Sequence, residues 1–383
     1  MQSLVGTVIG ARRDELRQAA VAHALRSRDA DACPCSSTAL CDPIGGAPVR
    51  SREIFGFGGG NGSAIDWTRV TTVAWAADDR LMCDAHAAGA RVIMAAPKPQ
   101  LALTSNRSAR AIWVADAVRR VRFNWLDGIV FDWEEPCEAG APSQHHYALL
   151  MRETRQALRA ISRSYQVTVC VAWSPDTIDG RGYDVRAFAA STDLVYVMDY
   201  DTRSQIYDAC IAAANAPYGG TLLGLRRYAE LGIPAGQLIL GVPWYGYRYR
   251  CLAGTGGGDR FCPIEATPFR GANCSDAVGV QLPYWKMLEQ LHCCSATGRR
   301  WDESQAAPWF NVFAGGTVLQ YWYDDPQSLR LKYASARRQG LRGVGPYTFT
   351  DADGKGGMMY QAFDAFLLPG GAHVDVVNSA ATA

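Results

Sequence analysis

Residues 127–134 read DGIVFDWE, an apolar run that also carries three carboxylates. The apolar part is typical of a buried strand, because Ile, Val, Phe and Trp favour strands that are covered on both faces. Successive strand side chains point to opposite faces, so Val130, Asp132 and Glu134 share one face and Glu134 lies at the carboxyl end. Buried carboxylates are costly unless they are paired or used, so this pair is either structural or functional.

Similar runs recur along the chain and alternate with helical patterns. Apolar residues at three- and four-residue spacing predict helices at 79–88, 108–122, 143–164, 220–231 and 326–339. Apolar strands that are each followed by a helix predict a parallel sheet, and eight of them favour an α/β (β/α)₈ TIM barrel over an open doubly wound sheet. The eight strand-like runs lie at 53–57, 70–75, 90–95, 128–133, 166–173, 194–200, 238–245 and 343–349.

The regular spacing breaks between the seventh and eighth runs. Residues 247–322 contain short pieces rich in Gly, Cys and aromatic residues, which predicts a small inserted α+β subdomain after the seventh strand. The barrel then spans 33–246 and 323–369, with an N-terminal extension at 1–32, interpreted as disordered or as a misassigned leader, and a flexible tail at 370–383. Active sites of such barrels lie at the carboxyl ends of the strands, so we expect the insertion to stand beside the site.

Composition narrows the partners and the compartment. Thirty-eight basic and 37 acidic residues give a formal charge of +1 with no basic run, which argues against nucleic acid, and no apolar run is long enough for a membrane span. Neither paired Cys motifs nor a His cluster supports a metal site, and no other cofactor is expected. Twelve cysteines and sequons at Asn61, Asn106 and Asn273 favour a lysosomal or secreted protein, although no signal peptide is evident.

The pair Asp132 and Glu134 suits acid catalysis. Each charge raises the pKa of the other group, which keeps a proton available for a general acid. DGIVFDWE closely resembles the D-G-x-D-x-D-x-E signature of glycoside hydrolase family 18, the chitinase family. Two further motifs of that family follow in order, M-x-Y-D at 198–201 and GVPWYG at 241–246.

Other blocks resemble a lysosomal branch of the same family, and the likeness extends over roughly residues 33–365. These blocks include WTRVTTVA at 67–74, VAWSPDTID at 171–179 and WYDDPQSL at 322–329. The resemblance implies a retaining β-N-acetylglucosaminidase that hydrolyses the β-1,4 bond of chitobiose (GlcNAc-GlcNAc) units from the reducing end, as in the breakdown of Asn-linked glycans. We expect a monomer that acts on chitobiose-containing oligosaccharides or chitooligosaccharides.

The resemblance also implies a role for individual residues. Glu134 would protonate the glycosidic oxygen, Asp132 would accept a hydrogen bond from the substrate acetamido N–H, and Tyr200 would donate to the acetamido oxygen, which itself attacks the anomeric carbon. Asp127 is a weaker candidate, because its parity turns it off the Val130 face and favours a structural role. The substrate-binding candidates are Asp127, Met198, Asp201, Trp244 and Tyr347.

The sequence departs from the family pattern at two positions, and it leaves open two alternative functions. Val130 occupies a position where most of the family has Asp, and Tyr347 stands where a Trp usually forms the floor of the sugar site. An endo-acting chitinase or endo-β-N-acetylglucosaminidase is the alternative enzyme. A non-catalytic lectin of this family usually lacks the acid at position 134, so Glu134 favours an enzyme.

Overall fold

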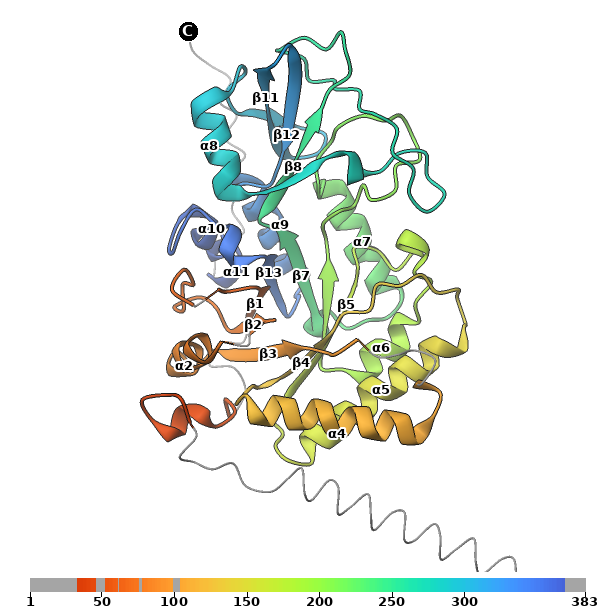
Figure 1. Ribbon diagram of the computed structural model, residues 1–383, viewed down its shortest axis with the longest axis vertical. Coiled ribbons are helices and arrows are strands. Elements are labelled where there is room, and N and C mark those ends of the chain that lie inside the picture. The colour runs from red at the N-terminus through yellow and green to blue at the C-terminus, as the bar shows by residue number, and fades with distance from the viewer. Residues whose placement is uncertain (1–32, 46–51, 61, 76–77, 99–103, 369–383) are drawn as a thin grey trace, which may run out of the picture.

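Eight parallel strands close into a barrel in the order β1-β13-β7-β6-β5-β4-β3-β2. The structure is a computed structural model that describes residues 33–45, 52–60, 62–75, 78–98 and 104–368 (Figure 1). The predicted (β/α)₈ barrel is therefore confirmed, while the predicted N-terminal extension and tail lie outside the described residues. The barrel strands are β1 (Glu53–Phe57), β2 (Thr72–Ala74), β3 (Arg91–Ala95), β4 (Gly128–Phe131), β5 (Gln166–Ala172), β6 (Leu194–Met198), β7 (Leu238–Pro243) and β13 (Gly343–Tyr347).

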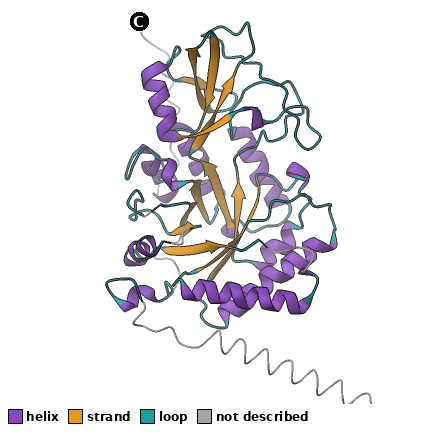
Figure 2. Cartoon of the chain, viewed as in Figure 1, coloured by secondary structure: helices purple, strands orange, loops and turns teal. Residues whose placement is uncertain are grey.

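Helices follow most of the barrel strands and cover the outside of the barrel, although none lies between β1 and β2 in the described residues (Figure 2). Each of the five predicted helices is present, with ends within a few residues of the expected ones. Helix α9 begins where the side chain of Asp325 accepts hydrogen bonds from the backbone N–H groups of Gln327 and Ser328. The helices of the barrel are α2 (Asp79–Ala87), α4 (Arg107–Phe123), α5 (Pro142–Arg159), α6 (Val185–Ser191), α7 (Tyr218–Glu230), α9 (Pro326–Arg338), α10 (Met358–Gln361) and α11 (Asp364–Leu367).

Alternation along the strands separates the barrel interior from the layer under the helices. On β4, Val130 belongs to an interior cluster with Cys170 and Tyr196, whereas Ile129 and Phe131 belong to the core between strands and helices. The strand begins with Gly128, where an added Cβ would collide with the carbonyl oxygen of Gln166 on β5. The alternation predicted from the sequence is therefore confirmed for β4, where Val130 faces the barrel interior.

A second sheet lies between β7 and β13 in chain order and forms the upper lobe in Figure 1. Its strands pair antiparallel in the order β10-β11-β12-β8-β9, and α8 (Tyr284–Cys294) packs against it. It starts directly after β7, two residues earlier than the sequence suggests. The strands are β8 (Tyr245–Arg250), β9 (Val280–Pro283), β10 (Arg300–Asp302), β11 (Ala307–Ala314) and β12 (Thr317–Trp322).

Ten of the twelve cysteines form disulfides, and only Cys137 and Cys170 are free. The expected local loop between Cys251 and Cys262 is confirmed. The other pairs are Cys33–Cys41, Cys35–Cys83, Cys210–Cys274 and Cys293–Cys294. No helix in the described ranges is both long enough and apolar enough to cross a bilayer.

Candidate active site

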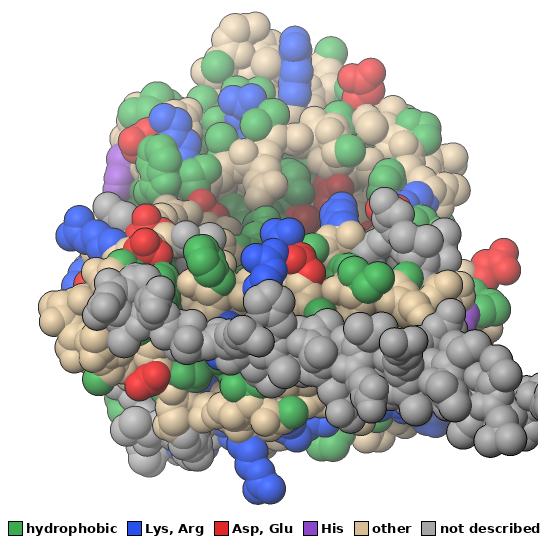
Figure 3. Space-filling view, turned by 60° about the horizontal axis from the view of Figure 1, so that its bottom comes forward, with side chains coloured by type: hydrophobic (Ala, Val, Ile, Leu, Met, Phe, Trp, Pro, Cys, Tyr) green, Lys and Arg blue, Asp and Glu red, His purple; other side chains and the backbone are tan. Residues whose placement is uncertain are grey.

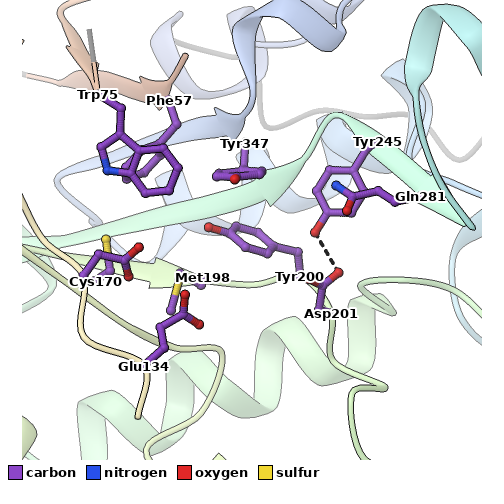
Figure 4. Close-up of a pocket in the computed structure, with 11 residues that line it drawn as sticks. Phe57, Trp75, Glu134, Cys170, Met198, Tyr200, Asp201, Tyr245, Gln281 and Tyr347 are labelled. Carbon is purple, nitrogen blue, oxygen red and sulfur yellow. Dashed lines mark hydrogen bonds between the residues drawn. The ribbon is translucent and has the colours of Figure 1, made fainter. Parts of the chain in front are cut away.

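A cavity of about 160 Å³ opens at the carboxyl ends of the barrel strands. We call it the inner pocket, and Figure 4 shows its side chains. In the space-filling view, one face of the molecule is hollowed near its centre, and acidic and hydrophobic side chains are visible in the hollow (Figure 3). The inner pocket is lined by Phe57, Trp75, Asp132, Glu134, Cys170, Met198, Tyr200, Asp201, Tyr245, Gln281 and Tyr347.

Asp132 follows the last residue of β4 and points into the inner pocket. The pKa of Asp132 is raised to about 7, mainly by burial and also by the charge of Glu134, whereas Arg181 and a hydrogen bond with the thiol of Cys170 act in the opposite direction. Its Oδ1 atom is buried and has no hydrogen-bond partner among the described residues. Asp132 can therefore accept a hydrogen bond from a bound molecule and can titrate near neutral pH.

Glu134 lies two residues further along, at the rim of the inner pocket, with 55% of its side chain exposed. The buried guanidinium of Arg181 donates to its carboxylate at 2.9 Å and to Asp179 at 3.1 Å. Glu134 is therefore accessible to a substrate, whereas Asp132 lies deeper and is largely buried, with its Oδ1 atom shielded from solvent. Burial is a larger cause of the raised pKa of Asp132 than the charge of Glu134.

Tyr200 and Asp201 come from the segment that follows β6. Burial raises the pKa of the Tyr200 hydroxyl well above its usual value, so this group stays protonated and can donate a hydrogen bond. Asp201 accepts hydrogen bonds from Tyr245 at 2.7 Å and Tyr247 at 2.9 Å, both from β8. The second sheet therefore reaches into the site and fixes one of its carboxylates.

Aromatic rings form the side of the inner pocket that faces the carboxylates (Figure 4). The ring of Tyr347 lies 5.4 Å from that of Tyr200 and 5.7 Å from that of Trp75, measured between centroids. Trp75 is 40% exposed and has a φ of +66°, a backbone conformation that non-glycine residues rarely adopt. Such exposed aromatic faces suit the C–H groups of a pyranose ring.

The structure brings together six of the eight residues that the sequence analysis singled out. Asp132, Glu134, Tyr200, Met198, Asp201 and Tyr347 all line the inner pocket.

Trp244 does not belong to the site, which corrects the sequence-based expectation. It is fully buried, packs against Tyr360 and Phe363, and donates its indole N–H to Tyr333. The reason is parity, because Ile239 on β7 faces the barrel interior and Trp244, five residues later, faces outward. Tyr245 points into the pocket instead.

Asp127 also lies away from the pocket, at the start of β4. It is fully buried, and its carboxylate accepts hydrogen bonds from the backbone of Ile44 and Val92 and contacts the ring of His86 at 2.8 Å. Its role is therefore to tie the amino ends of the strands together, as its parity suggests, and it cannot touch a substrate in the inner pocket.

Several residues of the site escaped the sequence analysis. Alternation could have found Cys170, which precedes the end of β5 by two residues, and Tyr245 in the GVPWYG motif. No local pattern marks Arg181 or Gln281, because they come from a loop after β5 and from the second sheet.

One group of potential metal ligands occurs in the described ranges. The sulfur atoms of Cys33, Cys35 and Cys41 lie close together, but all three are used in the Cys33–Cys41 and Cys35–Cys83 disulfides. Disulfide sulfurs are not thiolates and cannot serve as metal ligands. These three cysteines therefore form a disulfide-bonded cluster and not a metal centre.

The comparison with known proteins decides the family. Residues 100–353 match the family described as Glycosyl hydrolases family 18. This chain belongs to glycoside hydrolase family 18. It is a glycosidase.

Named relatives of this family 18 member cover most of its length. Di-N-acetylchitobiase of Mus musculus is 41% identical over 318 residues, which is 82% of this chain and 85% of the relative. Di-N-acetylchitobiase of Homo sapiens is 39% identical over 329 residues, or 85% of this chain and 84% of the relative. A class V chitinase from Nicotiana tobaccum in complex with NAG4 has the same fold, with a TM-score of 0.67, 17% identity, and coverage of 82% of this chain and 99% of that one.

Proposed function

We propose that this glycosidase hydrolyses the β-1,4 bond of chitobiose units and retains the anomeric configuration by using the substrate's own acetamido group. The observation that carries the proposal is the arrangement around Asp132, a buried carboxyl whose Oδ1 has no partner among the described residues. Glu134 and Tyr200 line the same cavity. An acetamido group placed there meets an acceptor for its N–H and a donor for its carbonyl oxygen.

Each residue then has a distinct chemical task. Glu134 donates a proton to the glycosidic oxygen as the bond to the leaving sugar breaks. The acetamido carbonyl oxygen attacks the anomeric carbon from the other face and forms a cyclic oxazolinium intermediate. Asp132 accepts the hydrogen bond of the acetamido N–H, and Tyr200 donates its hydroxyl to the acetamido oxygen.

The second half of the reaction restores the enzyme. Water attacks the anomeric carbon, the oxazolinium ring opens, and the ionised Glu134 takes the proton from that water. Two displacements at one carbon leave its configuration unchanged. Asp132, with a pKa near 7, can share a proton with the neighbouring Glu134 as charge develops and disappears.

The names of the relatives support the substrate class, since the mouse and human proteins are both called di-N-acetylchitobiase. We further propose that this chain acts at the reducing end of its substrates and works as a monomer. Five disulfides support an oxidising compartment, in line with a lysosomal or secreted protein. The sequons Asn106 and Asn273 lie on exposed residues, as glycan acceptors must.

Digestion of chitooligosaccharides labelled at the reducing end tests this proposal. We expect the labelled GlcNAc monosaccharide to appear first, whatever the length of the oligosaccharide. Labelled dimers and trimers as first products would indicate an endo-acting chitinase. Binding without any cleavage would indicate a lectin and would refute the assignment of Glu134 as an acid.

A further inference from the structure

A second cavity lies on the other side of Glu134. This outer pocket is also about 160 Å³ in volume, and it shares Glu134, Met198, Tyr200 and Asp201 with the inner pocket. The remainder of its wall includes Trp173, Asp179, Arg181, Ser204, Phe269 and Asp276. Two cavities of equal size that share Glu134 and the residues beside it suit two sugar units of equal size.

The position of the acid decides which sugar each cavity holds. In the proposed mechanism, Asp132 and Tyr200 contact the acetamido group of the sugar whose anomeric carbon reacts, and Asp132 lines only the inner pocket. Glu134 must stand at the oxygen between the two sugars. The leaving sugar therefore occupies the outer pocket.

Asp276 belongs to the inserted segment and lines the outer pocket. Its carboxyl has a hydrogen-bond acceptor atom that no described residue satisfies. Asp276 is only 8% exposed, and its Oδ2 has no hydrogen-bond partner within the described residues. The pKa of Asp276 is raised to about 7, mainly by burial and in part by the charges of Asp201 and Asp179. A buried acceptor without a partner is costly, and a ligand that brings hydrogen-bond donors would remove that cost.

The other polar groups of the outer pocket differ in how far they are satisfied. Asp179 accepts from Arg181 at 3.1 Å and from Ser204 at 2.7 Å. The indole N–H of Trp173, like the Oδ2 atom of Asp276, is buried without a partner in the described part of the chain. One free acceptor and one free donor in the same cavity match a sugar, whose hydroxyls both donate and accept.

Three loops are fastened to one another beside Asp276. Arg270 donates to the carbonyl oxygen of Asp179 at 2.6 Å, and Gln205 donates to the carbonyl oxygen of Arg270 at 2.8 Å. The Cys210–Cys274 disulfide and a backbone bridge between Ile206 and Cys274 join the segment after β6 to the insertion. The wall that carries Asp276 is thus held rigidly against the barrel, as a specificity site requires.

The mechanism proposed above places the leaving sugar in the outer pocket. We propose that Asp276 is a specificity-determining residue, which accepts hydrogen bonds from the hydroxyls of that sugar. The inference rests on the proposed function, because that function places the bond to be broken at Glu134. It assigns the inserted subdomain a part in substrate selection, since Asp276 and Phe269 come from the insertion.

The test compares two substrates with different leaving groups. Chitobiose places a sugar in the outer pocket, whereas a 4-nitrophenyl β-N-acetylglucosaminide places there an aryl group without hydroxyls. Loss of a hydrogen bond to a carboxylate should lower kcat/KM for chitobiose by about 10- to 100-fold in Asp276→Ala and Asp276→Asn. The same variants should hydrolyse the aryl glycoside within about twofold of the parent rate, and Asp208→Asn, a change at a carboxylate with 80% of its side chain exposed, should leave both rates unchanged.

Stability separates a binding role from a structural one. Because the Asp276 carboxyl lacks a partner for Oδ2, Asp276→Asn should keep or raise the free energy of unfolding measured in urea near pH 8. Equal losses on both substrates, an unchanged rate on chitobiose or a marked loss of stability would overturn the inference. A parent enzyme that cleaves chitobiose but not the aryl glycoside supports it, because the outer pocket then requires a sugar. A parent enzyme that cleaves neither substrate refutes the proposed function itself.

Discussion

Acidification from about pH 8 to about pH 5 should stabilise the folded protein, because several largely buried carboxyls, chiefly Asp132 and Asp276, bind protons more tightly in the folded state than in the unfolded state. Asp132 and Asp276 have pKa values of about 7, against an ordinary value of 3.8. Between these two pH values the folded chain holds protons that the unfolded chain has lost. The stability that these protons confer is present below the folded pKa and is lost as the pH rises through 7.

The size of the effect follows from the shift. From pH 5 to the folded pKa of about 7 there are roughly two pH units, and each unit corresponds to about 1.4 kcal/mol, so each carboxyl contributes about 2–3 kcal/mol. Above pH 8 both carboxyls are ionised in both states, and the contribution levels off. Asp66 and Asp116, whose pKa values are lowered, titrate below this range and do not oppose the trend.

Urea unfolding at four pH values between about 5 and 8 measures the effect, with Asp132→Asn as the main variant. The amide cannot ionise, so the variant should lose the contribution of Asp132, about 2–3 kcal/mol, and should be more stable than the parent near pH 8. Asp276 and Asp199, whose pKa values are raised to about 7 and about 6, keep their contributions in this variant. Asp208→Asn, at a site where 80% of the side chain is exposed, serves as the control and should keep the full slope.

Neighbouring groups also shift the pKa values of the two carboxyls. Glu134, Arg181 and Cys170 act on Asp132, and Asp201, Asp179 and Arg203 act on Asp276, but burial is the largest cause in both cases. A free energy of unfolding that is flat between pH 5 and 8, or that increases with pH, would refute the reasoning. So would an Asp132→Asn variant with the slope of the parent.

Three further outcomes are expected. Peptide mapping without reduction should recover the five disulfides and leave Cys137 and Cys170 free, whereas twelve free thiols in natively produced protein would contradict the oxidising compartment. Val130→Asp places a second carboxylate about 7 Å from Asp132 along the strand. At an effective dielectric constant near 20, its charge should move the acidic limb of the pH–kcat/KM profile upward by about one to two pH units. An unmoved limb in a folded variant would show that Val130 does not face Asp132. Tyr200→Phe removes the donor to the acetamido oxygen and should lower kcat about 10²–10³-fold, so a rate near that of the parent would exclude that donor role.

The fold could be predicted from local periodicity, whereas most residues of the site were identified through the motifs that resemble glycoside hydrolase family 18. Apolar strands separated by helical patterns gave the barrel, and alternation on β4 put Val130, Asp132 and Glu134 on one face. The same alternation of side chains along β7 points Tyr245, and not Trp244, of the GVPWYG motif into the pocket. The prediction for Trp244 was wrong because it did not take this alternation into account.

The rest of the site depends on contacts between segments that are distant in sequence. Arg181 meets Glu134 across 47 residues, and Asp276 reaches the outer pocket only because the insertion is fastened to the loops after β5 and β6. Such residues lie in loops without a periodic pattern, so no local signal marks them. The relative size of the causes that raise the pKa of Asp132 could not be predicted from the sequence either, because it depends on how deeply the carboxyl is buried.

The most direct test of the account is the hydrolysis of chitobiose by Glu134→Gln. The amide keeps the shape of the side chain and removes the proton, so kcat should fall by about 10²–10⁴-fold while binding of the disaccharide is retained. Calorimetric titration of the folded variant with chitobiose provides the matched measurement of binding. A variant that binds chitobiose but hardly cleaves it is the predicted result, and hydrolysis at close to the parent rate would contradict the assignment of Glu134 as the general acid.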